Sequence, residues 1–110
     1  MEGLVKGDVV VAPFPYSDFS QVKRRPNLVL AVLQGQDVML CQITSKPVSS
    51  PNAIAINNAD FATGYLRENS KVRSDKIITI DRGLVLYKVG SLKPEKVEEI
   101  IQKIVAILEQ

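Results

Sequence analysis

Apolar residues in the first half of the chain fall into short runs that are separated by turn residues. Such runs, rich in β-branched residues, are typical of strands. The predicted strands are residues 9–12, 28–33, 38–44 and 53–56. The second and third runs are almost continuously apolar, and a four-residue connection containing Gly35 joins them. This pattern predicts a hairpin of two central strands that are buried on both faces.

The second half of the chain continues the strand pattern and closes with one helix. Residues 70–73 and 76–81 indicate extended segments with a solvated face, and residues 84–89 indicate a strand that ends at Gly90. Residues 64–68 show little periodicity. From Pro94 onward, apolar residues recur at helical spacing, with proline at the first helical position and acids in the first turns. The predicted apolar stripe consists of Val97, Ile100, Ile101, Ile104, Val105 and Leu108.

The order of elements, several strands and then one helix, shows no alternation of strands and helices. It favours a mainly β fold, a small antiparallel barrel that the C-terminal helix partly closes. At 110 residues, we expect a single domain spanning residues 1–110. Hydrophobic residues make up 45% of the chain and charged residues 24%, which is typical of a globular protein.

Several classes of protein and site are disfavoured by composition. No apolar run approaches the roughly 18 residues of a membrane span, and the N-terminus does not resemble a signal peptide. The single cysteine, Cys41, lies in an apolar run, so we expect a buried side chain rather than a reactive thiol. Together these features predict a cytoplasmic protein that does not contact a membrane.

The chain contains no histidine, and this absence limits its chemistry. Without histidine, zinc sites and nucleophiles activated by histidine are excluded. A magnesium site made of carboxylates alone stays open in principle, but the acidic residues show no paired spacing. We therefore expect neither a metal nor another cofactor.

Three consecutive cations, Lys23, Arg24 and Arg25, precede Pro26. Pro26 disfavours a helical conformation for Arg25 and reads as the first residue of the buried strand that follows. Arg25 would then stand at the edge of that strand, where its planar, permanently charged guanidinium suits a phosphate. The alternative is an ordinary solvated basic loop. A second basic group follows at residues 71–76, and nucleic acid becomes a plausible partner if both groups share one face.

The third predicted strand ends in Thr44-Ser45-Lys46, which places two hydroxyls and a cation where the backbone leaves the sheet. These residues are also common where a strand simply ends in a turn. Nearer the N-terminus, Phe14 and Tyr16 lie among prolines. They are either edges of the core or a platform on which a nucleobase stacks.

Three stretches occur in one order: Gly7-Asp8-Val9-Val10 with Phe14-Pro15, residues 23–30 with the Arg25-Pro26 pair, and residues 41–46 ending in Ile43-Thr44-Ser45-Lys46. In this, the chain resembles the MazF/PemK family of toxin endoribonucleases, the mRNA interferases of type II toxin–antitoxin systems. Residues 70–81 and the segment 89–92 before the helix also resemble the family. The likeness extends from Lys6 to about Leu108.

The resemblance implies an SH3-like barrel of the CcdB/PemK type and a homodimer. It implies metal-independent cleavage of single-stranded RNA, which leaves a 2′,3′-cyclic phosphate and a 5′-hydroxyl, and inhibition by a partner antitoxin protein. The catalytic arginine and threonine of the family fall on Arg25 and Thr44. RNA contacts are expected from Lys23, Arg24, Ser45, Lys46 and Arg73.

The chemistry of these residue types agrees with that assignment, because a fixed guanidinium and a hydroxyl can stabilise charge on a phosphate under attack. The proton acceptor stays open among a transiently neutral Arg25, a carboxylate such as Asp18 or Asp81, and water. Asn27 stands where many relatives carry a small apolar residue, at the expected entrance of the RNA groove.

Two other functions are weighed against the endoribonuclease. CcdB-like gyrase poisons share the fold, but they use a C-terminal tryptophan, and this chain contains no tryptophan. The other alternative is a catalytically silent SH3-like relative that only binds RNA or an antitoxin.

Overall fold

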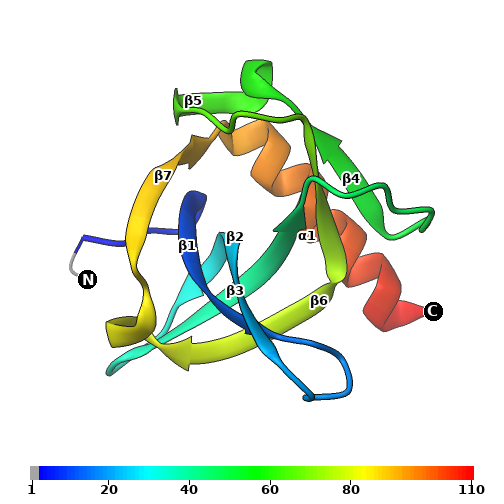
Figure 1. The fold of residues 1–110 in the computed structure, drawn as a ribbon. Coiled ribbons are helices and arrows are strands. Elements are labelled where there is room, and N and C mark those ends of the chain that lie inside the picture. Colours follow the sequence, from blue (N-terminus) through cyan, green and yellow to red (C-terminus); the bar gives the residue numbers. More distant parts are fainter. Residues whose placement is uncertain (1–2) are drawn as a thin grey trace.

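A single curled antiparallel sheet and one helix make up most of the computed structural model, which describes residues 3–110. The strands are β1 (Asp8–Pro15), β2 (Val22–Val32), β3 (Asp37–Thr44), β4 (Ala53–Ile56), β5 (Phe61–Gly64), β6 (Ser70–Asp81) and β7 (Tyr87–Leu92). They pair in the order β4-β6-β3-β2-β1-β7-β5. Figure 1 shows the sheet curling into a half-barrel, with α1 (Pro94–Glu109) at its open side. The predicted mainly β fold with a C-terminal helix is confirmed.

The central strands β2 and β3 are buried on both faces, as their continuous apolar runs predicted. Leu28 and Cys41 belong to the core cluster on the helix side, which also contains Val97 and Ile100 of α1. Val29 and Leu40 pack into a second cluster on the other face of the sheet. Because apolar side chains leave water on both faces, burial stabilises this hairpin from both sides.

The helix begins at Pro94, as predicted, since proline at the first helical position lacks only an N–H that would be unpaired there. Val97 and Ile100 are buried against the sheet, Ile100 completely. The predicted apolar stripe is wrong at its end, because Val105 is 38% exposed and Leu108 78% exposed. The last turns of α1 therefore lie beyond the buried core.

The first two strands extend past the prolines that were predicted to bound them. β1 continues through Pro13 and Pro15, and β2 begins at Val22 and contains Pro26. β1 pairs with β2 as far as the Pro15–Val22 pair, but its pairing with β7 ends at Val11. The prolines are thus tolerated where a strand has a partner on only one side and no second N–H is required. The three cations 23–25 consequently lie within β2 rather than in a loop before it.

The second half of the sheet also departs from the prediction. Residues 70–81, predicted as two segments, form the single strand β6, and the short β5 was missed. The predicted strand 84–89 is wrong at both ends, because residues 82–84 form a 3-10 helix and β7 runs through Gly90 to Leu92. A Cβ on Gly90 would lie 2.3 Å from the Thr63 carbonyl oxygen, so glycine is required where β5 and β7 meet rather than to end a strand.

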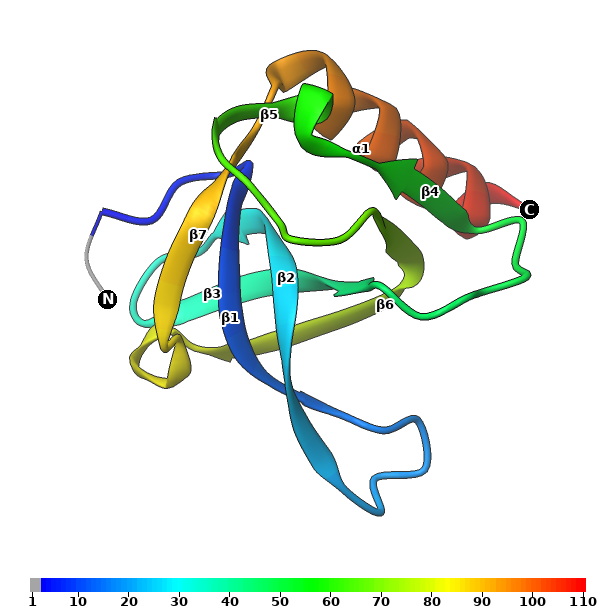
Figure 2. The ribbon, with the colours of Figure 1, turned by 45° about the horizontal axis from the view of Figure 1, so that its top comes forward.

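The sheet splits open at one end between its two central strands. Pairing of β2 with β3 stops at Asn27 and Gln42. Beyond this pair, β2 continues along β1, with Arg25 opposite Ala12, whereas β3 continues along β6, with Thr44 opposite Lys71. Figure 2 shows β2 descending beside β1 away from the end of β3. The split exposes side chains of both central strands at a common edge.

Among residues 3–110, no helix is both long and apolar enough to cross a membrane.

Candidate functional site

A hollow of about 580 Å³ occupies the split between β2 and β3. We call it the first hollow. Six of the residues predicted to act on or bind RNA line it: Lys23, Arg24, Arg25, Thr44, Ser45 and Lys46. The start of β2 contributes the first three, and Thr44 at the end of β3 and the two residues after it are the others. The split of the sheet thus brings together two groups that the sequence separates.

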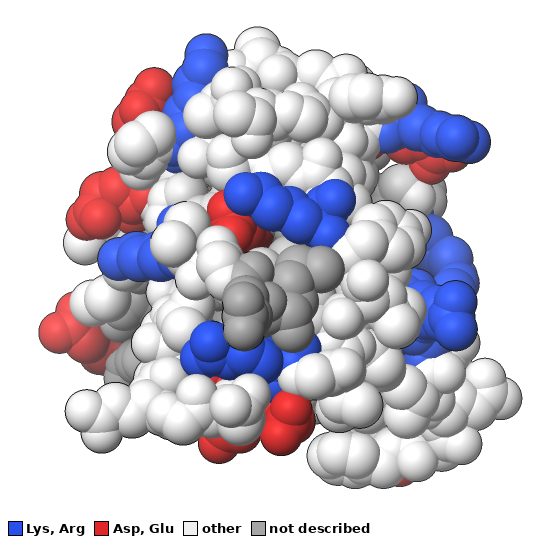
Figure 3. All heavy atoms as spheres, turned by 90° about the vertical axis from the view of Figure 1, so that its left-hand side faces the viewer, with Lys and Arg blue, Asp and Glu red and all other residues white. Residues whose placement is uncertain are grey.

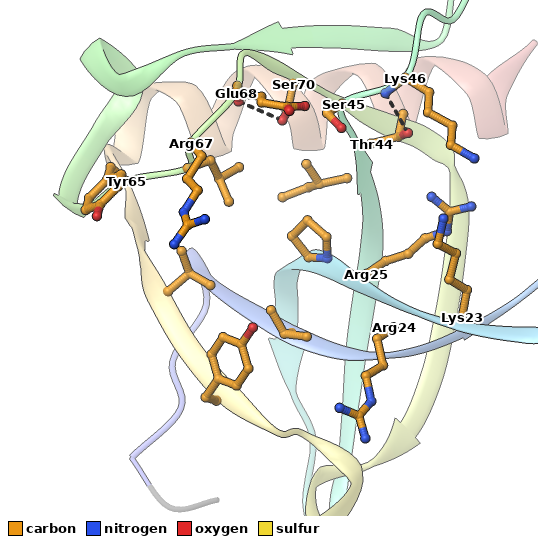
Figure 4. Close-up of a pocket in the computed structure, with 16 residues that line it drawn as sticks. Lys23, Arg24, Arg25, Thr44, Ser45, Lys46, Tyr65, Arg67, Glu68 and Ser70 are labelled. Atoms are coloured by element: carbon orange, nitrogen blue, oxygen red, sulfur yellow. Dashed lines mark hydrogen bonds between the residues drawn. The ribbon is translucent and has the colours of Figure 1, made fainter.

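Three cations converge on one point of this hollow. Figure 4 shows the charged ends of Lys23, Arg25 and Lys46 directed toward one another, whereas Arg24 points away. The positive charge of Lys46 lowers the pKa of Lys23 from its ordinary value, and that of Arg25 adds to the effect. In the part of the chain that the structure describes, no carboxylate lies within 4.0 Å of these cations. Uncompensated cations at one point form a site for an anion.

Arg25 and Thr44 line the same two sides of the split. Arg25 is half-buried, and its Nε is buried without a hydrogen-bond partner. Thr44 is 6% exposed, and its Oγ1 accepts a hydrogen bond from the Lys46 backbone N–H at 3.1 Å. That contact uses the hydroxyl oxygen as an acceptor and leaves its proton available to a ligand. The pair offers one fixed cation and one hydroxyl donor.

Arg73 does not reach the first hollow but lines a second one of about 550 Å³. This second hollow shares Arg25, Thr44 and Lys46 with the first. Pro26 and Ile43 line the first hollow, whereas Gln42, on the opposite face of β3 from Ile43, lines the second. The three shared residues therefore form the rim between two hollows on opposite faces of the sheet.

The two basic groups of the sequence meet only in part at this second hollow. Arg73 and Lys76 line it together with Arg25 and Lys46. Lys71 instead donates from Nζ to the Val48 carbonyl oxygen at 2.9 Å. The sequence left open whether both groups share one face, and the structure brings Arg25 of the first group to the same hollow as Arg73 and Lys76 of the second.

The face beside β7 shows no comparable cluster of positive charge. Figure 3 views the face on the left of Figure 1, beside β7, and shows scattered side chains of both signs among uncharged surface. The basic cluster at the β2–β3 split is thus a local feature, in agreement with a net charge of only +2.

The sequence of residues 5–108 matches the family model described as the PemK-like, MazF-like toxin of type II toxin–antitoxin systems. The chain belongs to this family. The match spans both basic groups, the Arg25-Pro26 pair and the Thr44 strand end, so the resemblance drawn from the sequence is confirmed.

Solved structures share the MazF-like fold. MazF of Deinococcus radiodurans has a TM-score of 0.76 at 21% identity, covering 97% of both chains. The MazE–MazF complex of the same organism has a TM-score of 0.71 at 19% identity, with 97% of each chain covered. A mycobacterial endoribonuclease in complex with its cognate antitoxin has a TM-score of 0.76 at 17% identity, covering 97% of this chain and 96% of that one. Comparison with functionally curated proteins gave no match.

Of the two carboxylates considered as proton acceptors, Asp18 lies at the site and Asp81 does not. Asp18 lines the second hollow, but hydrogen bonds from the Ser20 hydroxyl and backbone N–H lower its pKa below the ordinary value. Asp81 pairs with Asp37 at the far end of β3 and caps the 3-10 helix 82–84, so it is excluded. Within residues 3–110, no cluster of acidic side chains and cysteine could hold a metal ion.

Sequence reasoning missed several residues that line the first hollow. Tyr65, Arg67 and Glu68 reach it from the segment between β5 and β6, and Tyr87 reaches it from β7. Figure 4 shows the Arg67 guanidinium directed into the hollow. Tyr65, Arg67 and Glu68 lie in a segment without periodicity, where the only signal is the combination of aromatic and charged side chains within four residues.

Three further sequence interpretations are decided by burial. Cys41 is buried and donates from Sγ to the Arg73 carbonyl oxygen, and burial raises its pKa to about 12, so the expected inert thiol is confirmed. Phe14 is a core residue, 5% exposed, whereas Tyr16 is 37% exposed and lines the second hollow. Asn27 is fully buried in β2, which corrects its expected place at the entrance of a groove.

Proposed function

We propose that this protein is a toxin endoribonuclease that cleaves single-stranded RNA without a metal ion. The observation that supports the proposal is the meeting of Arg25 and Thr44 at the rim of two cation-lined hollows. A strand of RNA that crosses the rim would place one phosphate at Arg25 and Thr44 and the neighbouring nucleotides in the two hollows.

The proposed reaction is an internal transfer of the phosphoryl group. The ribose 2′-oxygen attacks the adjacent phosphorus and loses its proton, while the bond from phosphorus to the 5′-oxygen breaks and that oxygen gains a proton. The products are a 2′,3′-cyclic phosphate and a 5′-hydroxyl. Negative charge grows on the non-bridging oxygens, where the Arg25 guanidinium and the Thr44 hydroxyl would stabilise it. Lys23 and Lys46 would add positive charge at the same point.

The remaining predicted residues would hold the RNA on either side of the scissile phosphate. Arg24 and Ser45 line the first hollow, and Arg73 lines the second. Contacts of this kind to phosphates position the strand and carry no sequence information. Tyr16, Tyr65 and Tyr87 offer faces on which exposed bases stack, so the preferred RNA is unpaired.

Glu68 is a further candidate for the proton acceptor. It lines the first hollow, whereas Asp18 is held ionised by Ser20 and is therefore a weak base. A Glu68→Gln variant keeps the size of the side chain and removes its basicity. If Glu68 accepts the proton, this variant loses turnover but retains RNA affinity, and unchanged turnover would assign the proton to water or to Arg25.

We further propose that a homodimer acts on RNA and that a cognate antitoxin protein inhibits it. The fold is shared with the MazE–MazF complex and with an endoribonuclease bound to its antitoxin. The alternative is a silent relative that binds RNA or antitoxin without cleavage. The uncompensated cations fit both functions, and turnover of RNA distinguishes them.

The proposed reaction is tested with a synthetic RNA and the same RNA carrying one 2′-deoxyribose on the 5′ side of the cut. With EDTA present, the RNA should be cut and the deoxy substrate should survive, because its nucleophile is missing. The 3′-terminal fragment should accept phosphate from a kinase without prior dephosphorylation. Cleavage of the deoxy substrate at the same bond would contradict the mechanism, and intact RNA would favour the silent relative.

A further inference from the structure

A buried amide side chain lies two residues after Arg25. Asn27 is fully buried in β2 and is one of the few polar side chains in the core. Its Nδ2 donates to the Arg25 carbonyl oxygen at 2.8 Å and lies 3.5 Å from the Ala12 carbonyl oxygen. Arg25 and Ala12 are directly paired residues of β2 and β1. A single amide group therefore ties down the backbone on which Arg25 stands.

The position of this amide coincides with a gap in the sheet. Pro26 has no N–H, and pairing of β2 with β3 begins only at Asn27 and Gln42. The backbone of Arg25 is consequently supported by β1 alone. The Asn27 amide supplies a hydrogen bond where the strand on the other side has separated.

The other half of the amide is unsatisfied, since Asn27 Oδ1 is buried without a hydrogen-bond partner. Burying an unpaired acceptor destabilises a fold, and a small apolar residue would avoid this penalty. Side chains alternate along the strand, so Asn27 shares its face with Arg25 and with Val29 of the second core cluster. A polar group that breaks a packing rule two residues from a reactive arginine points to a requirement of function.

We infer that Asn27 is a positioning residue for Arg25, a role that rests on the proposed endoribonuclease function. By holding the Arg25 carbonyl, Asn27 fixes the start of the side chain whose guanidinium meets the phosphate across from Thr44. Stabilisation of a transition state requires the donor to be in place before the reaction begins, and small displacements reduce the rate steeply. Asn27 contacts neither hollow and so acts only through Arg25.

The test compares the steady-state kinetics of the wild type and Asn27→Val with a short fluorescent RNA, well below the lowest Tm of the set. Valine is close in size, suits a strand and lacks the donor. We expect kcat to fall about tenfold while KM stays unchanged, because RNA binding depends on other cations. Asn27→Ser, which restores a smaller hydroxyl donor, should recover part of kcat.

Two further variants separate positioning from a general effect on the fold. Ser74→Ala removes a hydroxyl that, like Asn27 Oδ1, is buried without a hydrogen-bond partner; it lies outside both hollows, and its loss should leave kcat unchanged. In an Arg25→Lys background, Asn27→Val should produce no further loss, because the two residues act as one unit.

Unchanged kcat in Asn27→Val, or the same tenfold loss in both backgrounds, would overturn the positioning role. Equal cleavage by the wild type and Arg25→Ala would instead overturn the proposed function.

Discussion

Arg25 and Thr44 each lie two residues beyond the last pair that joins β2 to β3, Asn27 with Gln42. If the ladder continued, the two side chains would be neighbours in an unbroken sheet. Instead, β2 follows β1 and β3 follows β6, so the hydroxyl and the guanidinium line the opening between them. The active site that we propose is therefore produced by a change of strand partners, and rigid strands hold both groups.

The hydroxyl of Thr44 is predicted to be needed for turnover. Thr44→Val keeps the shape of the side chain but removes the proton donor, and we expect kcat to fall about 10²-fold. Thr44→Ser keeps the donor and should retain most of the activity. Circular dichroism and Tm measurements of both variants control for folding. Equal activity of the valine variant and the wild type would remove Thr44 from the mechanism.

The rate of cleavage is predicted to be flat between about pH 6 and 8. The chain has no histidine, the side chain whose ordinary pKa lies in this range. Hydrogen bonds from Ser20 lower the pKa of Asp18 further below this range, and the charge of Lys46 lowers the pKa of Lys23. Initial rates in overlapping buffers of constant ionic strength test this, and a bell centred near pH 7 would contradict it.

As the pH rises, RNA affinity is predicted to start falling at a lower pH than it would if Lys23 had the ordinary pKa of a lysine. Lys46 lowers the pKa of Lys23 in the free protein, and a bound phosphate favours the charged lysine. Affinity should thus be constant below the pKa of free Lys23 and fall as the pH rises through it. Lys46→Gln removes the main cause and should move the start of this fall to higher pH. Fluorescence anisotropy with an uncleavable 2′-deoxy RNA measures both curves, and identical pH dependence in the two proteins would refute the coupling.

The helix is predicted to contribute to stability through its first turns only. Ile100 is fully buried against the sheet, so Ile100→Ala should lower the free energy of unfolding by about 2–5 kcal/mol. Leu108 is 78% exposed, and Leu108→Ala should change it by less than about 0.5 kcal/mol. Denaturant unfolding of both variants provides the comparison. Similar losses at the two positions would mean that the end of the helix is covered in solution.

The parts of the fold that could be predicted are those whose structure is recorded in neighbouring residues of the sequence. The central hairpin and the helix were predicted because continuous apolar runs and helical spacing record their burial directly. The extents of β1 and β2 were misjudged because proline is excluded from a strand only where its N–H is needed, and one-sided pairing is a property of the whole sheet. Gly90 was read as an end of a strand, although it permits close contact with β5.

In the candidate site, too, only residues within short local patterns could be predicted. Arg25 and Thr44 were singled out by two short motifs, the cations before Pro26 and the Thr44-Ser45-Lys46 strand end, and the family resemblance assigned their roles. Tyr65, Arg67 and Glu68 were missed, because only the path of the chain after β5 brings them to the hollow. Asn27 was misplaced, since a polar residue next to a basic stretch gives no sign that it is buried.

The central claim, that Arg25 carries a metal-independent cleavage of RNA, is tested most directly by one comparison. A long single-stranded RNA is incubated with EDTA and with the wild type, Arg25→Ala or Arg24→Ala, and the cuts are mapped by primer extension. Arg24 points away from the point where the cations converge, so its variant controls for a general loss of charge. We expect discrete cuts by the wild type, weaker cuts at the same positions by Arg24→Ala, and a loss of at least about 10²-fold in Arg25→Ala. Equal cutting by Arg25→Ala and the wild type would contradict the claim.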